Sequence, residues 1–157
     1  MNESDKPAEA KRPSSKMRWG VGIAILAVVG VIALMAMGGY AEHVDRISRA
    51  QNMEAVSLLR SARTVLTMEF QENNKWPVTL DKIISETSGA HTGSVGITRG
   101  GGGTGEIELT ATMRTEGVDP RGAGKTILMV SSDGGRNWTC RPGTMPKEHL
   151  PYECRTN

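Results

Sequence analysis

The sequence has few aromatic residues, few cysteines and little excess of charge. Phe, Trp and Tyr together make up 4% of the 157 residues, whereas glycine occurs 19 times. This composition predicts a small, turn-rich globular part, and the length allows one domain with extensions but no second enzyme-sized core. The net charge of +2 is too small to indicate a nucleic-acid-binding protein by itself.

The two cysteines, Cys140 and Cys154, both lie near the C-terminus. A zinc site would require about four ligands at finger-like spacing, and the sequence lacks that pattern. In an exported segment, an isolated pair of cysteines favours a disulfide over a metal site. We therefore expect a covalent link at the end of a small domain and neither a metal nor a cofactor.

The sequence contains no recognisable catalytic constellation. His43, His91 and His149 are far apart, without a serine motif or metal-ligand spacing around them, and are interpreted as solvated surface residues. The stretch Gly122–Thr126 resembles the end of a Walker A loop. However, the first glycine of that motif would fall on Asp119, and a strand follows where the loop should open a helix. An exported enzyme and a nucleotide-binding protein are both disfavoured.

A long apolar run lies near the N-terminus, where Trp19–Met37 forms about 19 residues without a charge, close to the ~20 needed to cross a bilayer as a helix. The alternative is a cleaved secretory signal, but its apolar core is usually about 7 to 15 residues long. The length favours a membrane-spanning anchor. The positive charges that precede it are Lys6, Lys11, Arg12, Lys16 and Arg18.

Because Lys and Arg next to a membrane helix stay on the cytoplasmic side, the basic tail fixes the expected topology. We predict a cytoplasmic tail over residues 1–18, a transmembrane helix over 19–39 and a periplasmic domain over 40–157, in a single-pass inner-membrane protein. Gly20, Ala24 and Ala27 share one face of the helix, where small side chains would let another membrane helix approach closely. Small residues are common in membrane helices in any case, so this packing role stays open alongside a purely compositional explanation.

From Tyr40 to about Asn73 the pattern becomes one-sided and predicts an amphipathic helix that continues out of the membrane. Its apolar stripe is too broad and irregular for a free-standing coiled coil, so a C-terminal domain should cover it. Asn73 and the Trp76-Pro77 pair should end the helix. The residues of the stripe are Val44, Ile47, Ala55, Leu58, Leu59, Ala62, Val65, Leu66 and Phe70.

The C-terminal half reads as short strands between glycine-rich turns, after a short helical turn at Leu80–Ser85. Gly100–Gly103 is interpreted as a flexible hairpin tip. The fold class is therefore α+β: a membrane-spanning helix that continues into a long amphipathic helix packed on a four-stranded antiparallel sheet, with a C-terminal disulfide loop. The predicted strands are Ser94–Thr98, Glu106–Met113, Lys125–Ser131 and Arg136–Cys140.

The end of the chain carries a series of motifs, which in chain order are Gly124–Leu128, Gly134-Gly135, Trp138–Cys140, Met145-Pro146, Leu150-Pro151 and Cys154-Arg155. This series resembles the closing stretch of type IVa pilins, in which a lysine-led strand, a Trp-x-Cys strand and a Leu-Pro-x-x-Cys ending bound a disulfide loop. Arg49–Gln51 and Trp76-Pro77 also match the family. The resemblance covers about Trp19 to Arg155 and implies a disulfide between Cys140 and Cys154.

The N-terminus departs from the family's Gly-Phe-Thr-Leu-Ile-Glu signature, which a prepilin peptidase cuts after the glycine. Here Gly20 and Gly22 are the possible cleavage points, and the position of the glutamate falls on Ile25 or Ala27, which are both neutral. A carboxylate that would register neighbouring subunits is thus missing.

The resemblance implies a structural subunit of a type IV pilus that supports adhesion, twitching motility or DNA uptake. Its partners would be the inner membrane, other pilin subunits, which include copies of itself, and the pilus assembly machinery. The degenerate leader favours an alternative: an uncleaved, membrane-anchored accessory protein that binds pilins or this machinery. Neither the adhesive target nor DNA binding follows from the sequence.

Overall fold

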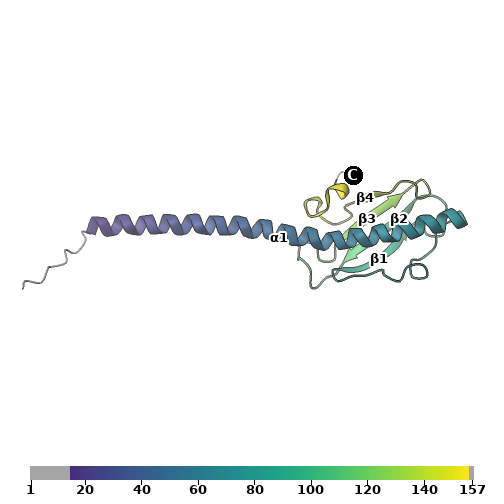
Figure 1. Ribbon diagram of the computed structural model, residues 1–157, viewed down its shortest axis with the longest axis horizontal. Helices are drawn as coiled ribbons and strands as arrows, with labels where there is room; N and C mark the ends of the chain where they lie inside the picture. The colour runs from purple at the N-terminus through teal and green to yellow at the C-terminus, as the bar shows by residue number, and fades with distance from the viewer. Residues whose placement is uncertain (1–14, 156–157) are drawn as a thin grey trace, which may run out of the picture. The chain divides into compact units, whose positions relative to one another are not determined.

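The computed structural model describes residues 15–155, and it describes side chains for residues 25–39 and 42–155. The chain forms two compact units, Met1–Ala41 and Glu42–Asn157. Within residues 15–155 the elements are one long helix, four strands and two short 3-10 helices. Figure 1 shows the helix and the sheet. Each unit is described below by itself.

The helix α1 spans Ser15–Asn73 and continues through Gly38 and Gly39. It ends where the sequence predicts. Asn74 adopts a left-handed conformation with φ of 51°, and its N–H donates to the carbonyl oxygen of Phe70 at 2.8 Å. Asparagine is one of the few residues that tolerates this conformation, which closes the last turn of a helix.

The sheet has the strand order β1-β2-β3-β4, and each neighbouring pair is antiparallel. The β1 strand has two register irregularities, one at each end of its pairing with β2. In β2 every second side chain is buried, as the alternation in the sequence predicts. The strands are β1 (Thr92–Arg99), β2 (Ile107–Met113), β3 (Thr126–Ser131) and β4 (Thr139–Arg141).

The core of the second unit forms where the apolar stripe of α1 packs on the inner face of the sheet (Figure 1). Leu59 and Leu66 are completely buried among strand residues such as Leu109 and Ile127. The predicted helix-on-sheet fold is confirmed. The stripe is shorter than predicted, because Ile47 is 42% exposed.

The fourth strand begins three residues later than predicted, at Thr139 instead of Arg136. The cause is a side-chain turn: one carboxylate oxygen of Asp133 accepts the backbone N–H of Asn137 at 2.9 Å, and the other accepts its side-chain amide at 2.6 Å. Asp and Asn readily make such local bonds, which compete with strand pairing.

The glycine-rich segment after β1 is the hairpin connection to β2, and it is tied to the aromatic residue that follows the helix. The backbone N–H of Trp76 donates to Gly103 at 2.8 Å, and its indole Nε1 donates to the carbonyl oxygen of Gly105 at 2.8 Å. Trp76 also packs between Phe70 and Trp138, with ring centroids 4.2 and 6.0 Å away. The connection therefore closes one end of the core.

Candidate functional site

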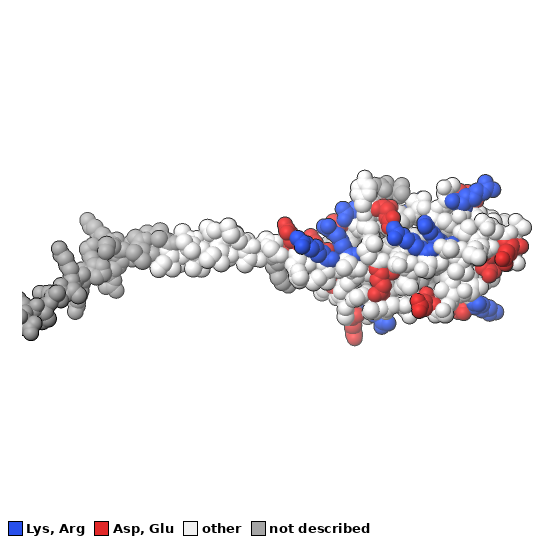
Figure 2. Space-filling view, in the orientation of Figure 1, with Lys and Arg blue, Asp and Glu red and all other residues white. Residues whose placement is uncertain are grey.

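The first unit presents an uncovered apolar helix. Every described residue from Ile25 to Gly39 is exposed, and this stretch is uncharged in the space-filling view (Figure 2). Leu26, Leu34 and Met35 are each more than 70% exposed. Within the described residues, one helix is long and apolar enough to cross a membrane. An apolar surface of this extent indicates contact with lipid or with other helices.

The sequence-predicted leader and packing residues lie at the start of this helix. The side chains of Gly20, Gly22 and Ala24 are outside the described residues, so their predicted roles stay predictions. Ala27 is exposed, and so is Ile25 at 58%. The two positions where a glutamate was expected therefore present neutral side chains on an uncovered helix.

In the second unit, Cys140 of β4 and Cys154 of the second 3-10 helix (η2, Tyr152–Cys154) form a disulfide. The enclosed loop is also held by hydrogen bonds. The backbone N–H of Met145 donates to the carbonyl oxygen of Thr126 at 3.1 Å, and Arg60 pairs with the carboxylate of Glu153. The predicted disulfide-closed C-terminal loop is thus joined to both the sheet and the helix.

A carboxylate on α1 holds the start of β1. One oxygen of Glu54 accepts the backbone N–H groups of His91 and Thr92, both at 2.9 Å, and the other lies 2.9 Å from Nδ1 of His91. Burial raises the pKa of Glu54, but hydrogen bonds from His91 and Thr92 outweigh it and lower this pKa to about 2. Glu54 therefore stays ionised and acts as a fixed acceptor.

A second polar contact links the helix to the β2–β3 connection. The guanidinium of Arg121 donates to Asp45 of α1 at 2.6 Å and to Asp119 at 2.8 and 3.1 Å. Its hydrogen bonds hold the pKa of both carboxyls below the ordinary value, against the opposing effect of burial. The backbone N–H of Asp119 also donates to the side chain of Gln51 at 2.8 Å. The connection is thus bound to two successive turns of the helix.

The interpretation of all three histidines as solvated surface residues was wrong for His149, which is only 6% exposed, and incomplete for His91, which pairs with Glu54. His43 is exposed. The carbonyl oxygen of His149 accepts the side-chain amide of Asn52 at 2.8 Å. Asn52 and Ser48 are buried polar residues that sequence reasoning missed, although they lie on the apolar face four residues apart, and that spacing is the available signal.

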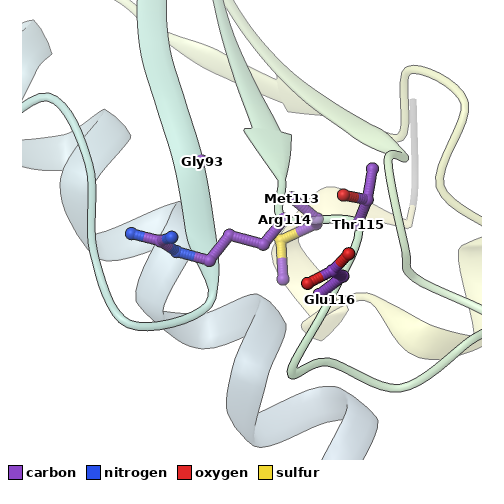
Figure 3. A pocket seen from close by; sticks show the side chains of 5 residues that line it. All are labelled: Gly93, Met113, Arg114, Thr115 and Glu116. Atoms are coloured by element: carbon purple, nitrogen blue, oxygen red, sulfur yellow. The ribbon is translucent and has the colours of Figure 1, made fainter.

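A depression of about 360 Å³ lies where β1 begins and β2 ends (Figure 3). Its charged residues do not meet, because the Arg114 guanidinium points away from the Glu116 carboxylate, and Nε of Arg114 donates to the carbonyl oxygen of Gly89 at 3.0 Å. Among the described residues, no group of three or more His, Cys, Asp or Glu side chains is placed to hold a metal ion. This depression offers neither a nucleophile with a base nor a ligand set.

The described residues thus combine an exposed apolar helix with a disulfide-closed domain. The sequence is 25% identical over 156 residues to the type IV major pilin protein PilE1 of Neisseria gonorrhoeae, covering 85% of this chain and 88% of the relative. It is 27% identical over 122 residues to a fimbrial protein of Neisseria meningitidis, covering 74% of this chain and 66% of the relative.

The sequence profile of the family Pilin (bacterial filament) matches residues 48–155. This match covers residues 48–73 of α1, the whole sheet and the disulfide loop. The chain therefore belongs to the pilin family.

Proposed function

We propose that this protein is a structural subunit of a type IV pilus. A pilin is a structural protein and not an enzyme. The observation that carries the proposal is the combination of the matched pilin domain with an apolar helix whose described residues 25–39 are all exposed. In a filament, neighbouring subunits would cover this helix, and before assembly the lipid would. Adhesion, twitching motility and DNA uptake are the activities that such a pilus would support.

The proposed topology follows from the distribution of charge. The basic tail, residues 1–18, would stay in the cytoplasm, residues 19–39 would cross the inner membrane, and residues 40–157 would lie in the periplasm or on the pilus. The relatives named as type IV major pilins support a place on the pilus.

A second candidate function is favoured by the neutral residues at the expected glutamate position. Ile25 and Ala27 cannot offer a carboxylate to the N-terminal amine of a neighbouring subunit. Moving the charges of the basic tail across the membrane would be costly, so an uncleaved chain would stay anchored. In this case the protein would be a membrane-bound accessory that binds pilins or the assembly machinery.

Two measurements on the same cells distinguish these functions. The full chain is expressed where a prepilin peptidase is present, pili are sheared off, and the protein is blotted in both fractions while its intact mass is measured. Loss of everything up to Gly20 or Gly22, together with abundant protein in the sheared pili, supports the pilus subunit. An intact tail and absence from the sheared fraction refute it and support the accessory. As a control, a variant that carries Phe-Thr-Leu-Ile-Glu after Gly20 should show increased cleavage and incorporation.

A further inference from the structure

Two adjoining depressions lie between α1 and the segment that leads into β4. One, of about 150 Å³, is lined by Arg60, Arg63, Trp138 and Glu153, among others. The other, of about 350 Å³, is lined by Arg63, Thr64, Arg136, Asn137 and Trp138, among others. Because Arg63 and Trp138 line both, the two form one continuous surface, which we call the Arg63–Trp138 groove.

The indole of Trp138 is held in a fixed position in this groove. Its Nε1 donates to the hydroxyl of Thr67 and to the carbonyl oxygen of Gly135, both at 3.1 Å. Its ring meets that of Trp76 edge to face in the core. Trp138 is nevertheless only half-buried, so part of an immobilised aromatic ring faces solvent. An exposed ring that loses no freedom on binding is a favourable surface for a ligand ring.

Two arginines beside this ring have no partner for their guanidinium groups among the described residues. Arg63 is half-buried on α1, and Arg136 is exposed on the β3–β4 connection. By contrast, Arg60 at the other end of the groove is paired with Glu153. A guanidinium without an acceptor can bind a planar anionic group through two parallel hydrogen bonds.

The groove thus offers the ring of Trp138 in the middle and the unpaired guanidinium groups of Arg63 and Arg136 on one side. The carboxylate of Glu153 and other polar side chains also line it. We propose that the Arg63–Trp138 groove binds an acidic saccharide, with its carboxylate at Arg63 and Arg136 and the apolar face of a sugar ring on Trp138. The hydroxyl groups of the sugar would donate to acceptors such as Glu153 and the side-chain oxygen of Asn137. This proposal goes beyond the structural role and does not depend on assembly into a pilus.

Nucleic acid fits this groove less well. Single-stranded nucleic acid is bound along a consistently positive track that follows the phosphates. Here the Arg60–Glu153 pair adds no net charge, so the positive part of the groove is limited to Arg63 and Arg136. Acidic and basic side chains are also intermixed over the visible face of the second unit (Figure 2). A ligand with both an anionic group and hydroxyl donors matches such a mixed lining, whereas a polyphosphate chain does not.

The test is a titration of the purified full chain in detergent micelles with sialyllactose, followed by ligand-observed NMR. Lactose is the matched neutral saccharide, inorganic sulfate is the bare anion, and single-stranded oligodeoxythymidine represents nucleic acid. The proposal predicts that sialyllactose binds about tenfold or more tightly than lactose, because a charge-assisted hydrogen-bond pair is lost in lactose. Binding should also weaken as salt is added.

Variants locate the site. Arg63→Gln and Arg136→Gln should each weaken sialyllactose binding about tenfold while leaving the thermal midpoint unchanged, since both side chains lack partners in the described structure. Arg99→Gln is the control, because Arg99 lies at the opposite edge of the sheet, on β1. The proposal is overturned if sialyllactose does not bind, if lactose binds equally well, or if the Arg63 and Arg136 variants bind as tightly as the unaltered chain. Tighter binding of the oligonucleotide, or full competition by sulfate alone, would also overturn it.

Discussion

Replacing Glu54 by glutamine tests how strongly one carboxylate fastens the sheet to the helix. In the folded protein this carboxylate accepts three hydrogen bonds, all of 2.9 Å. Two come from the backbone N–H groups of His91 and Thr92, and the third comes from the ring of His91. A glutamine has nearly the same shape and keeps one acceptor oxygen. The variant therefore removes the charge with little change in packing.

The pKa of Glu54 and a count of its hydrogen bonds describe the same interaction, and both give the same magnitude. Lowering the pKa of Glu54 from 4.5 to about 2 stabilises the folded state by about 3 kcal/mol at neutral pH, at ~1.36 kcal/mol per pKa unit. Each charge-assisted hydrogen bond also contributes about 1 kcal/mol more than a neutral one, and Glu54 makes three. Glu54→Gln should therefore lower the free energy of unfolding by about 3 kcal/mol.

The pH dependence gives a sharper signature than the stability at one pH. Because the pKa of Glu54 is lower in the folded state, its contribution is complete above pH 4.5 and is lost as the pH falls from there towards 2. The difference in the free energy of unfolding between Glu54→Gln and the unaltered chain should therefore become smaller as the pH falls from 4.5 towards 2. Denaturant unfolding of the full chain in detergent, followed by tryptophan fluorescence at several pH values, measures it.

Glu72→Gln is the matched control, since Glu72 is exposed on the same helix. The control should unfold as the unaltered chain does. If Glu54→Gln unfolds at the same denaturant concentration as the control at pH 7, Glu54 does not fasten β1 to the helix. A stability difference that stays constant down to pH 2 would equally refute the electrostatic explanation.

Three further predictions concern the core, the disulfide and the ion pairs of the second unit. Leu66→Ala should lower the free energy of unfolding by about 2 to 5 kcal/mol, whereas Met68→Ala, at a position 58% exposed, should change it little; equal thermal midpoints for the two would contradict the packing. Reduction of the Cys140–Cys154 disulfide should lower the free energy of unfolding by about 3 kcal/mol. Two alkylatable thiols in the unreduced folded protein would show that the bond does not form. Arg121→Gln should lower the thermal midpoint at neutral pH. This lowering of the midpoint should become smaller below pH 3.8, the ordinary pKa of Asp119, because the lowered pKa of this carboxyl stabilises the fold only above that value. An equal difference in thermal midpoint between Arg121→Gln and the unaltered chain at pH 7 and pH 3 would contradict this explanation.

The features that could be predicted from the sequence are those that depend on residues close together in the chain. The burial of Leu59 and Leu66 follows from their spacing on one helix face, and the alternation in β2 follows from the pleat of a strand. The helix end follows from Asn73 and the Trp76-Pro77 pair. In each case the signal and the structure it specifies lie within about ten residues, which is the range in which periodicity and turn chemistry operate.

The features that could not be predicted depend on partners far apart in the sequence. Asn52 meets the carbonyl oxygen of His149 across 97 positions, and Glu54 meets His91 across 37. A polar residue on a helix gives no indication of which distant backbone group it will bind. The late start of β4 has a local cause, the turn held by Asp133, but the β-branched and aromatic residues beside it favoured a longer strand.

The polar contacts supply something that the apolar stripe cannot. A stripe that repeats every three or four residues would present a similar surface after a slip of one helical turn, about 5.4 Å, so apolar burial alone only weakly fixes the position of α1 along the sheet. The same slip would separate Arg121 from Asp45 and the backbone N–H of Asp119 from Gln51. It would also leave the N–H groups of residues 91–92 without Glu54. Buried polar groups without partners are costly, so the slipped arrangement is disfavoured by several bonds at once. The helix is therefore held against the sheet by apolar residues and kept in register by the two carboxylate contacts.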